Sequence, residues 1–209
     1  MIARPSTLSI RRRAAAVVLV MGTAWACAGG DDPPPSAGMD QEASPADAFW
    51  AALEGLCGQA FGGTVVESEP PDDAFAGREL IMHVRQCGAD TIRVPFHVGD
   101  DRSRTWVVSR TESGLRLKHD HRHGDGTEDE VTWYGGDTTA PGTATTQEFP
   151  ADAHTRSLLP AAATNVWTIE LQPGRSFAYA LRREGTDRRF RAEFDLTSPI
   201  PAPPAPWGF

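Results

Sequence analysis

Short segments in which apolar and polar residues alternate follow one another through most of this 209-residue chain, with tight turns between them. Successive side chains of a β-strand point to opposite faces, so this pattern predicts strands with one buried and one solvated face. The strand-like segments are 61–68, 80–86, 91–98, 105–111, 115–123, 130–135, 165–171, 175–183 and 188–196. Eight to ten such strands in a row predict an all-β fold, an antiparallel up-and-down meander that closes into a small barrel, because closure removes exposed strand edges.

One short helix is expected before the strands, over Pro45–Leu56. Ser44 suits the N-cap, a proline suits the first helical position, and Gly58 follows as a stop signal. The apolar residues recur at three- and four-residue spacing, as on one face of a helix: Phe49, Trp50, Leu53, Leu56 and Cys57.

The N-terminus has the features of an export signal. Arg11–Arg13 precede an apolar run over residues 14–26, which is too short to span a membrane. Ala24 and Ala26 are small residues directly before Cys27, and this arrangement resembles the lipobox of bacterial lipoproteins, in which the cysteine is acylated. The resemblance implies a lipid anchor on Cys27 in the bacterial cell envelope. The alternative is ordinary cleavage after Ala26, which releases a secreted protein.

Composition divides the chain into four parts. Residues 1–26 form the signal peptide, and 27–44 form a Gly-, Asp-, Pro- and Ser-rich tether with little to bury. Residues 45–198 are long enough for one domain with a sizeable core. Residues 199–209 form a proline-rich tail, for which the sequence allows either disorder or docking on the domain through its two aromatic residues.

The cysteines predict one disulfide bond. With Cys27 acylated, Cys57 and Cys87 are left as an even number in an exported chain, and a bond between them is the natural interpretation. The alternative is a pair of buried thiols.

The charge balance argues against a nucleic-acid partner. The whole chain carries 20 Lys and Arg against 28 Asp and Glu, a net charge of −8. The signal peptide contains four arginines and no acids, so the mature chain has 16 basic against 28 acidic residues and a net charge of −12. A protein that binds nucleic acid needs a basic face.

The most chemically distinctive segment is the histidine-rich strand. Alternation places His119, His121 and His123 on the same face as Leu115 and Leu117. We expect this face to point into the barrel near one mouth, so that the imidazoles can bind a ligand. The opposite face then sees water and carries the charged residues: Arg116, Lys118, Asp120 and Arg122.

Four further residues are candidates for ligand binding. His83 and Arg85 share one face of a strand, and an inward arginine would need a carboxylate partner or ligand. His97 and Arg102 flank a tight loop whose arginines can hold an anionic group.

Three resemblances to known groups of proteins add further expectations. The helix followed by Leu56–Gly63 and a meander resembles the lipocalin-like (calycin) barrels, which implies a cavity for a small molecule. The chain also resembles a group of bacterial secreted proteins without an assigned activity. The segment His121-Arg-His123, followed by Glu128, resembles the first half of the cupin metal motif, which implies a divalent metal held by His121, His123 and Glu128.

These observations favour a non-enzymatic, exported and lipid-anchored barrel that binds a small apolar or anionic ligand. A cupin-like metal-dependent enzyme is the second interpretation, and a structural envelope lipoprotein without a ligand is the third. We find no nucleophile-elbow, dinucleotide or phosphate-loop motif, and no cofactor is indicated.

Overall fold

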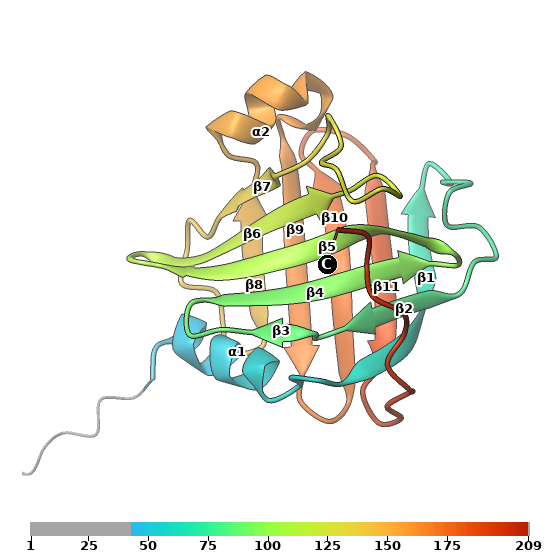
Figure 1. Ribbon diagram of the computed structural model, residues 1–209. Coiled ribbons are helices and arrows are strands. Elements are labelled where there is room, and N and C mark those ends of the chain that lie inside the picture. Colours follow the sequence, from blue (N-terminus) through green and yellow to red (C-terminus); the bar gives the residue numbers. More distant parts are fainter. Residues whose placement is uncertain (1–42, 209) are drawn as a thin grey trace, which may run out of the picture. The chain divides into compact units, whose positions relative to one another are not determined.

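The computed structural model describes residues 43–208, which begin with the expected helix, α1 (Pro45–Glu54) (Figure 1). The Ser44 hydroxyl accepts a hydrogen bond from the Asp47 backbone N–H at 3.1 Å, as the N-cap prediction requires. The helix ends two residues earlier than expected, with Gly55 at its C-cap. Its inward side chains are buried: Phe49, Trp50 and Leu53.

Eleven strands follow α1, and two short helical segments lie between β8 and β9. The strands are β1 (Ala60–Glu69), β2 (Leu80–His83), β3 (Gln86–Cys87), β4 (Thr91–Val98), β5 (Asp101–Thr111), β6 (Gly114–His121), β7 (Tyr134–Asp137), β8 (Thr146–Pro150), β9 (Asn165–Gln172), β10 (Ser176–Arg183) and β11 (Arg189–Asp195). The helical segments are α2 (Ala153–Leu158) and the 3-10 turn η1 (Pro160–Ala162).

The sheet is an up-and-down meander that closes almost completely on itself. Its order is β7-β6-β5-β4-β2-β1-β11-β10-β9-β8, with β3 paired to β4 beside this path. Every paired neighbour is antiparallel, and the last strand pairs with the first, so the chain runs around the barrel in sequence order. The predicted fold class, an all-β barrel preceded by one short helix, is therefore confirmed.

The barrel is interrupted between β7 and β8, and α2 covers this seam. The Asp152 backbone N–H donates to the Gly135 carbonyl at 3.0 Å. The Thr155 hydroxyl donates to the same carbonyl and accepts from the Gly135 N–H, each at 2.7 Å. These contacts satisfy backbone groups that the missing strand pair would leave unpaired. Neither β8 nor α2 was expected from the sequence.

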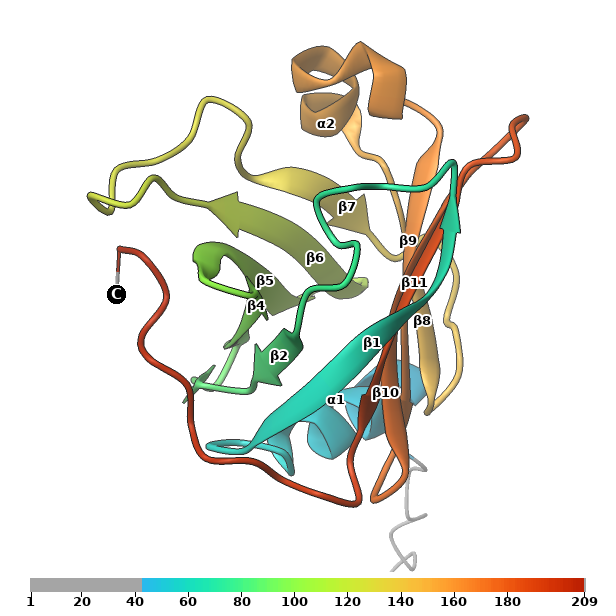
Figure 2. The same ribbon diagram turned by 90° about the vertical axis from the view of Figure 1, so that its right-hand side faces the viewer.

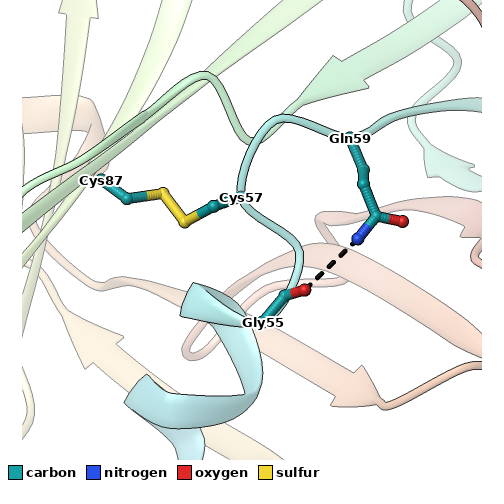
Figure 3. The surroundings of a disulfide bond; sticks show 4 residues. All are labelled: Gly55, Cys57, Gln59 and Cys87. Atoms are coloured by element: carbon teal, nitrogen blue, oxygen red, sulfur yellow. Dashed lines mark hydrogen bonds between the residues drawn. A yellow bond between two sulfur atoms is a disulfide. The ribbon is translucent and has the colours of Figure 1, made fainter. Parts of the chain in front are cut away.

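A disulfide bond joins Cys57, just after α1, to Cys87 in β3 (Figure 3). The two Cα atoms are 6.3 Å apart, within the normal range for a disulfide. The loop that carries Cys57 is also held by Gln59, whose side-chain amide donates to the Gly55 carbonyl at 3.3 Å. The predicted pairing is confirmed, and such bonds persist in oxidising compartments.

Several strand boundaries differ from the expected ones. The strand predicted over 130–135 begins only at Tyr134, in β7, because residues 130–133 belong to the connection that follows β6. Gly99, with a φ of +58°, makes the β4–β5 turn so tight that β5 begins at Asp101 instead of Thr105. The segment 80–86 is divided into β2 and β3. The histidine-rich strand ends at His121, two residues before His123.

The proline-rich tail docks along the outside of the barrel (Figure 2). Ile200 donates its backbone N–H to the Ala60 carbonyl at 2.8 Å. The Arg102 guanidinium donates to the Ala205 carbonyl at 3.1 Å, and the Trp207 N–H donates to the Arg102 carbonyl at 3.1 Å. Docking is thus the arrangement of residues 200–208. The signal peptide, the tether through residue 42, the proposed lipid site at Cys27, and Phe209 lie outside the described residues.

One end of the barrel is filled by α1. Asp47 forms an ion pair with Arg110, whose guanidinium lies 4.8 Å from the centre of the Trp50 ring. Further aromatic rings continue this core towards the other end of the barrel. The rings of Trp106 and Phe96 are stacked, with their centres 4.6 Å apart. No helix within residues 43–208 is long and apolar enough to cross a membrane.

Candidate ligand-binding site

A cavity of about 330 Å³ lies inside the barrel, at the end that carries α2 and η1, whereas α1 lies at the other end (Figure 1). This volume is at the lower end of the range for small-molecule pockets, which is roughly 300–1,000 Å³. Seven aromatic side chains line it: Phe75, Phe96, Trp106, Tyr134, Trp167, Tyr179 and Phe190. Such rings provide a large apolar contact area for a planar molecule.

His119 lies at the floor of the cavity and is buried. Its Nδ1 is 3.1 Å from the Tyr134 carbonyl oxygen, which can only accept, so Nδ1 carries the proton. Its Nε2 must then accept, and the Tyr179 hydroxyl donates to it at 2.7 Å. Burial lowers the pKa of His119 to about 3, so the ring is neutral at physiological pH.

His121 stands one step nearer the mouth on the same face of β6. Its Nε2 is 3.0 Å from the Tyr134 hydroxyl. Burial, and then the charge of nearby Arg104, lower the pKa of His121 to about 4. Burial raises the pKa of Tyr134 to about 12. The polar groups of the cavity floor are therefore neutral and bonded to one another.

Arginines outnumber carboxylates at the mouth of the cavity. Arg104, Arg183 and Arg188 line the cavity, together with Asp72. Arg104 forms an ion pair with Asp101, and its guanidinium lies 5.6 Å from the centre of the Phe75 ring. The cavity thus grades from a neutral aromatic floor to a positively charged rim.

A larger concavity, of about 800 Å³, lies on the outer face of β9, β10, β11 and β1, and three of its charged residues pair with one another. Arg191 donates to both carboxylate oxygens of Glu170, at 2.7 and 3.0 Å, and to Glu193 at 2.7 Å. A ligand there would have to displace these pairs, so the interior cavity is the better candidate.

Two of the predicted histidines line the cavity, and the third does not. His119 and His121 point inward with Leu115 and Leu117, which are buried as expected. The inward orientation predicted for His123 is wrong: its side chain is 45% exposed, because β6 ends before it and the chain turns away.

The other four predicted ligand residues lie away from the cavity. His83 and Arg85 lie on the outward face, since Met82 and Val84, which alternate with them in the sequence, are fully buried. His97 is buried outside the cavity, and burial, with Arg102 and His83 nearby, lowers its pKa to about 4. The Arg102 side chain holds the docked tail, as described above.

Asp120 corrects the expectation that the outer face of β6 sees water. Its side chain is fully buried. Arg122 donates to one of its carboxylate oxygens at 2.7 Å, and Arg93 reaches the other at 3.4 Å. This part of the outer face is therefore an ion-paired layer.

The three residues of the cupin-like motif are engaged separately. Glu128 accepts from Arg122 at 3.1 Å and from the Trp133 indole N–H at 2.9 Å. His121 is held inside by Tyr134, whereas His123 lies at the surface. Within residues 43–208, the one group of three residues spaced for a metal is His123, Asp129 and Glu130, in the β6–β7 connection.

The three arginines of the mouth and the aromatic wall were not identified from the sequence. A signal existed for two of them: Arg183 follows Leu181 by two residues, and Arg188 precedes Phe190 by two residues, so alternation places both arginines on the apolar faces of their strands. Arg104 was missed because its strand was expected to begin one residue later.

No protein-family model matches the chain, and no match was found among curated proteins or solved structures.

Proposed function

We propose that this protein is a non-enzymatic binding protein that holds a small molecule with an apolar body in the barrel cavity. The observation that carries the proposal is the cavity itself, an open space of about 330 Å³ walled by aromatic rings. Core packing normally leaves few voids larger than a water molecule. At the opposite end of the same barrel, α1 fills the interior with the buried side chains of Phe49, Trp50 and Leu53.

The floor of the cavity supports binding rather than catalysis. His119 is neutral and bonded on both nitrogens, and Tyr179 has its pKa raised by burial. A general base needs a pKa near the working pH and access to the substrate. These two groups instead provide a rigid polar floor beneath the apolar wall.

We further propose that the protein is exported and anchored to the bacterial envelope through lipid on Cys27, with no nucleic-acid partner. The disulfide supports an oxidising compartment. Mass spectrometry of the membrane fraction should find diacylglycerol on Cys27, and Cys27→Ser should release the protein. A wild-type protein that is soluble and unmodified would contradict the anchor.

Ligand binding can be tested with a neutral aromatic probe, 1-naphthalenemethanol, by calorimetry on the mature protein. We expect saturable binding with one site per chain. Ala161→Trp should weaken it at least about tenfold, because Ala161 lines the cavity and is exposed enough to accept a larger side chain. The matched control is Ala153→Trp, an exposed position of α2 outside the cavity lining.

The alternatives give different results. Binding that Ala161→Trp leaves unchanged would place the probe elsewhere, and no binding at all would favour a structural envelope protein. Stoichiometric Zn²⁺ or Mn²⁺ in the purified protein, lost on His121→Ala, would instead favour the cupin-like enzyme.

A further inference from the structure

Two arginines face each other across the β10–β11 hairpin at the mouth of the cavity. The register pairs Leu181 with Phe190 and Arg182 with Arg189, so the next pair is Arg183 and Arg188. The Arg183 backbone N–H donates to the Arg188 carbonyl at 3.2 Å, which confirms this register. Both side chains line the cavity. Like charges directly opposite each other in a sheet are unfavourable.

Neither arginine has a carboxylate partner among the described residues. The Arg183 Nε donates to the neutral side-chain amide of Asn165 at 2.9 Å. The Arg188 Nε is buried and has no hydrogen-bond partner. Asp72 also lines the cavity, but no ion pair joins it to either arginine within residues 43–208.

The adjacent arginine on the outer face shows what ordinary pairing looks like in this hairpin. Arg182 lies within 3.3 Å of a Glu148 oxygen and 3.8 Å of a Glu184 oxygen. The outward position thus has two carboxylates, and the inward positions have none. The outward Arg189 has no carboxylate either, but its guanidinium donates to the backbone carbonyls of Thr186 and Arg188. On the inward side, the buried Arg188 Nε has no acceptor.

We propose that the cavity ligand is an organic carboxylate with an aromatic body, and that Arg183 and Arg188 together bind its carboxylate group. This inference rests on the proposed function and specifies its ligand class. Guanidinium groups bind carboxylates with paired, charge-assisted hydrogen bonds. A carboxylate between the two arginines would replace their mutual repulsion with attraction and would give the buried Arg188 Nε an acceptor.

The polarity of the cavity also determines the orientation of the ligand. Below the two arginines, the inner faces of the hairpin carry Leu181 and Phe190, and Trp167 lies opposite Leu181 on β9. A carboxylate at that depth would lose its hydration without gaining a charged partner, which is strongly unfavourable. The aromatic body therefore enters first, and the carboxylate stays at the mouth.

The test compares two probes of nearly equal shape, 1-naphthoic acid, which is anionic at pH 7.5, and neutral 1-naphthalenemethanol. Wild type should bind the acid about tenfold or more tightly than the alcohol. Arg188→Gln and Arg183→Gln should each reduce that preference towards one, because they weaken binding of the acid more than binding of the alcohol. The matched control, Arg189→Gln, removes the same charge next in sequence from the outer face and should keep the preference.

The outcomes separate this inference from the proposed function. If both probes bind wild type equally and Arg188→Gln changes neither affinity, the carboxylate site is overturned while the cavity remains a binding site. If folded wild type binds neither probe, the proposed function itself fails.

A stability measurement provides a second readout. Because Arg188→Gln removes a like-charge contact, the ligand-free variant should melt at the same temperature as wild type or higher. A clearly lower melting temperature would show that Arg188 serves the fold and would overturn its assignment as a ligand-binding residue.

Discussion

The Tyr179 hydroxyl donates to Nε2 of His119 at 2.7 Å, although the two residues are 60 positions apart in the chain. The bond crosses the floor of the cavity from β10 to β6. Among the described residues, the Tyr179 hydroxyl is the only hydrogen-bond donor to Nε2. The other ring nitrogen, Nδ1, donates to the Tyr134 carbonyl. The polar groups at the floor of the cavity are therefore neutral, and they are hydrogen-bonded to one another.

Removing the Tyr179 hydroxyl should show how much this bond contributes to the free energy of unfolding. Tyr179→Phe leaves the buried Nε2 of His119 without a donor, which should lower the free energy of unfolding by about 1–3 kcal/mol. Tyr134→Phe is the matched control, since it removes a 3.0 Å bond to His121, which is less buried and can be reached by water. Urea denaturation compares the two variants. A larger loss in Tyr134→Phe would contradict this assignment.

Stability should fall as the solution is made acidic. The pKa values of His97, His119 and His121 are lowered from 6.5 to about 4, 3 and 4. Below pH 6.5 the unfolded chain therefore binds protons that the folded chain does not, so the free energy of unfolding decreases, by on the order of 2–3 kcal/mol for each of the three histidines by pH 4.5.

Two variants identify the groups responsible for this pH dependence. His119→Gln should flatten the plot of unfolding free energy against pH between 6.5 and 4. His154→Gln, at an exposed position of α2, should leave the slope as in wild type. A wild-type stability that is constant over this range would show that the three imidazoles are not kept neutral by burial.

The seam between β7 and β8 should not tolerate a side chain. A Cβ on Gly136 would lie 1.8 Å from the Pro150 carbonyl oxygen, so Gly136→Ala must push the two strands apart. We expect a loss of about 1–3 kcal/mol in unfolding free energy. Gly62→Ala, in β1, is the control because its Cβ would meet nothing within 4 Å. Equal melting temperatures for the two variants would argue against close contact at the seam.

Loss of the disulfide should destabilise the domain as a whole. Cys57 and Cys87 are 30 residues apart, and releasing a loop of this size should lower the free energy of unfolding by about 3 kcal/mol. The double variant Cys57→Ser, Cys87→Ser and the reduced wild-type protein should show the same decrease in denaturation midpoint. If a reducing agent leaves the wild-type midpoint unchanged, the bond is absent from the isolated protein.

Local pattern alone determined much of this protein. Period-two alternation identified most of the strands and placed Leu115, Leu117 and His119 inside the barrel, because neighbouring side chains of a strand must point to opposite faces. The capping residues located the start of α1, and the count of cysteines indicated the disulfide. Each of these inferences depends on residues that are close in sequence or on a simple pairing rule.

The composition of the cavity mouth was decided only by the tertiary structure. Arg104 comes from β5 and Arg183 and Arg188 from the β10–β11 hairpin, and they meet because the strands close into a barrel with one particular register. Asp120 was expected to be solvated, yet its side chain is fully buried and lies within ion-pair distance of Arg93, a residue of β4, as well as of its sequence neighbour Arg122. Alternation specifies which face a side chain occupies, but what lies opposite that face depends on strand pairing across the whole chain.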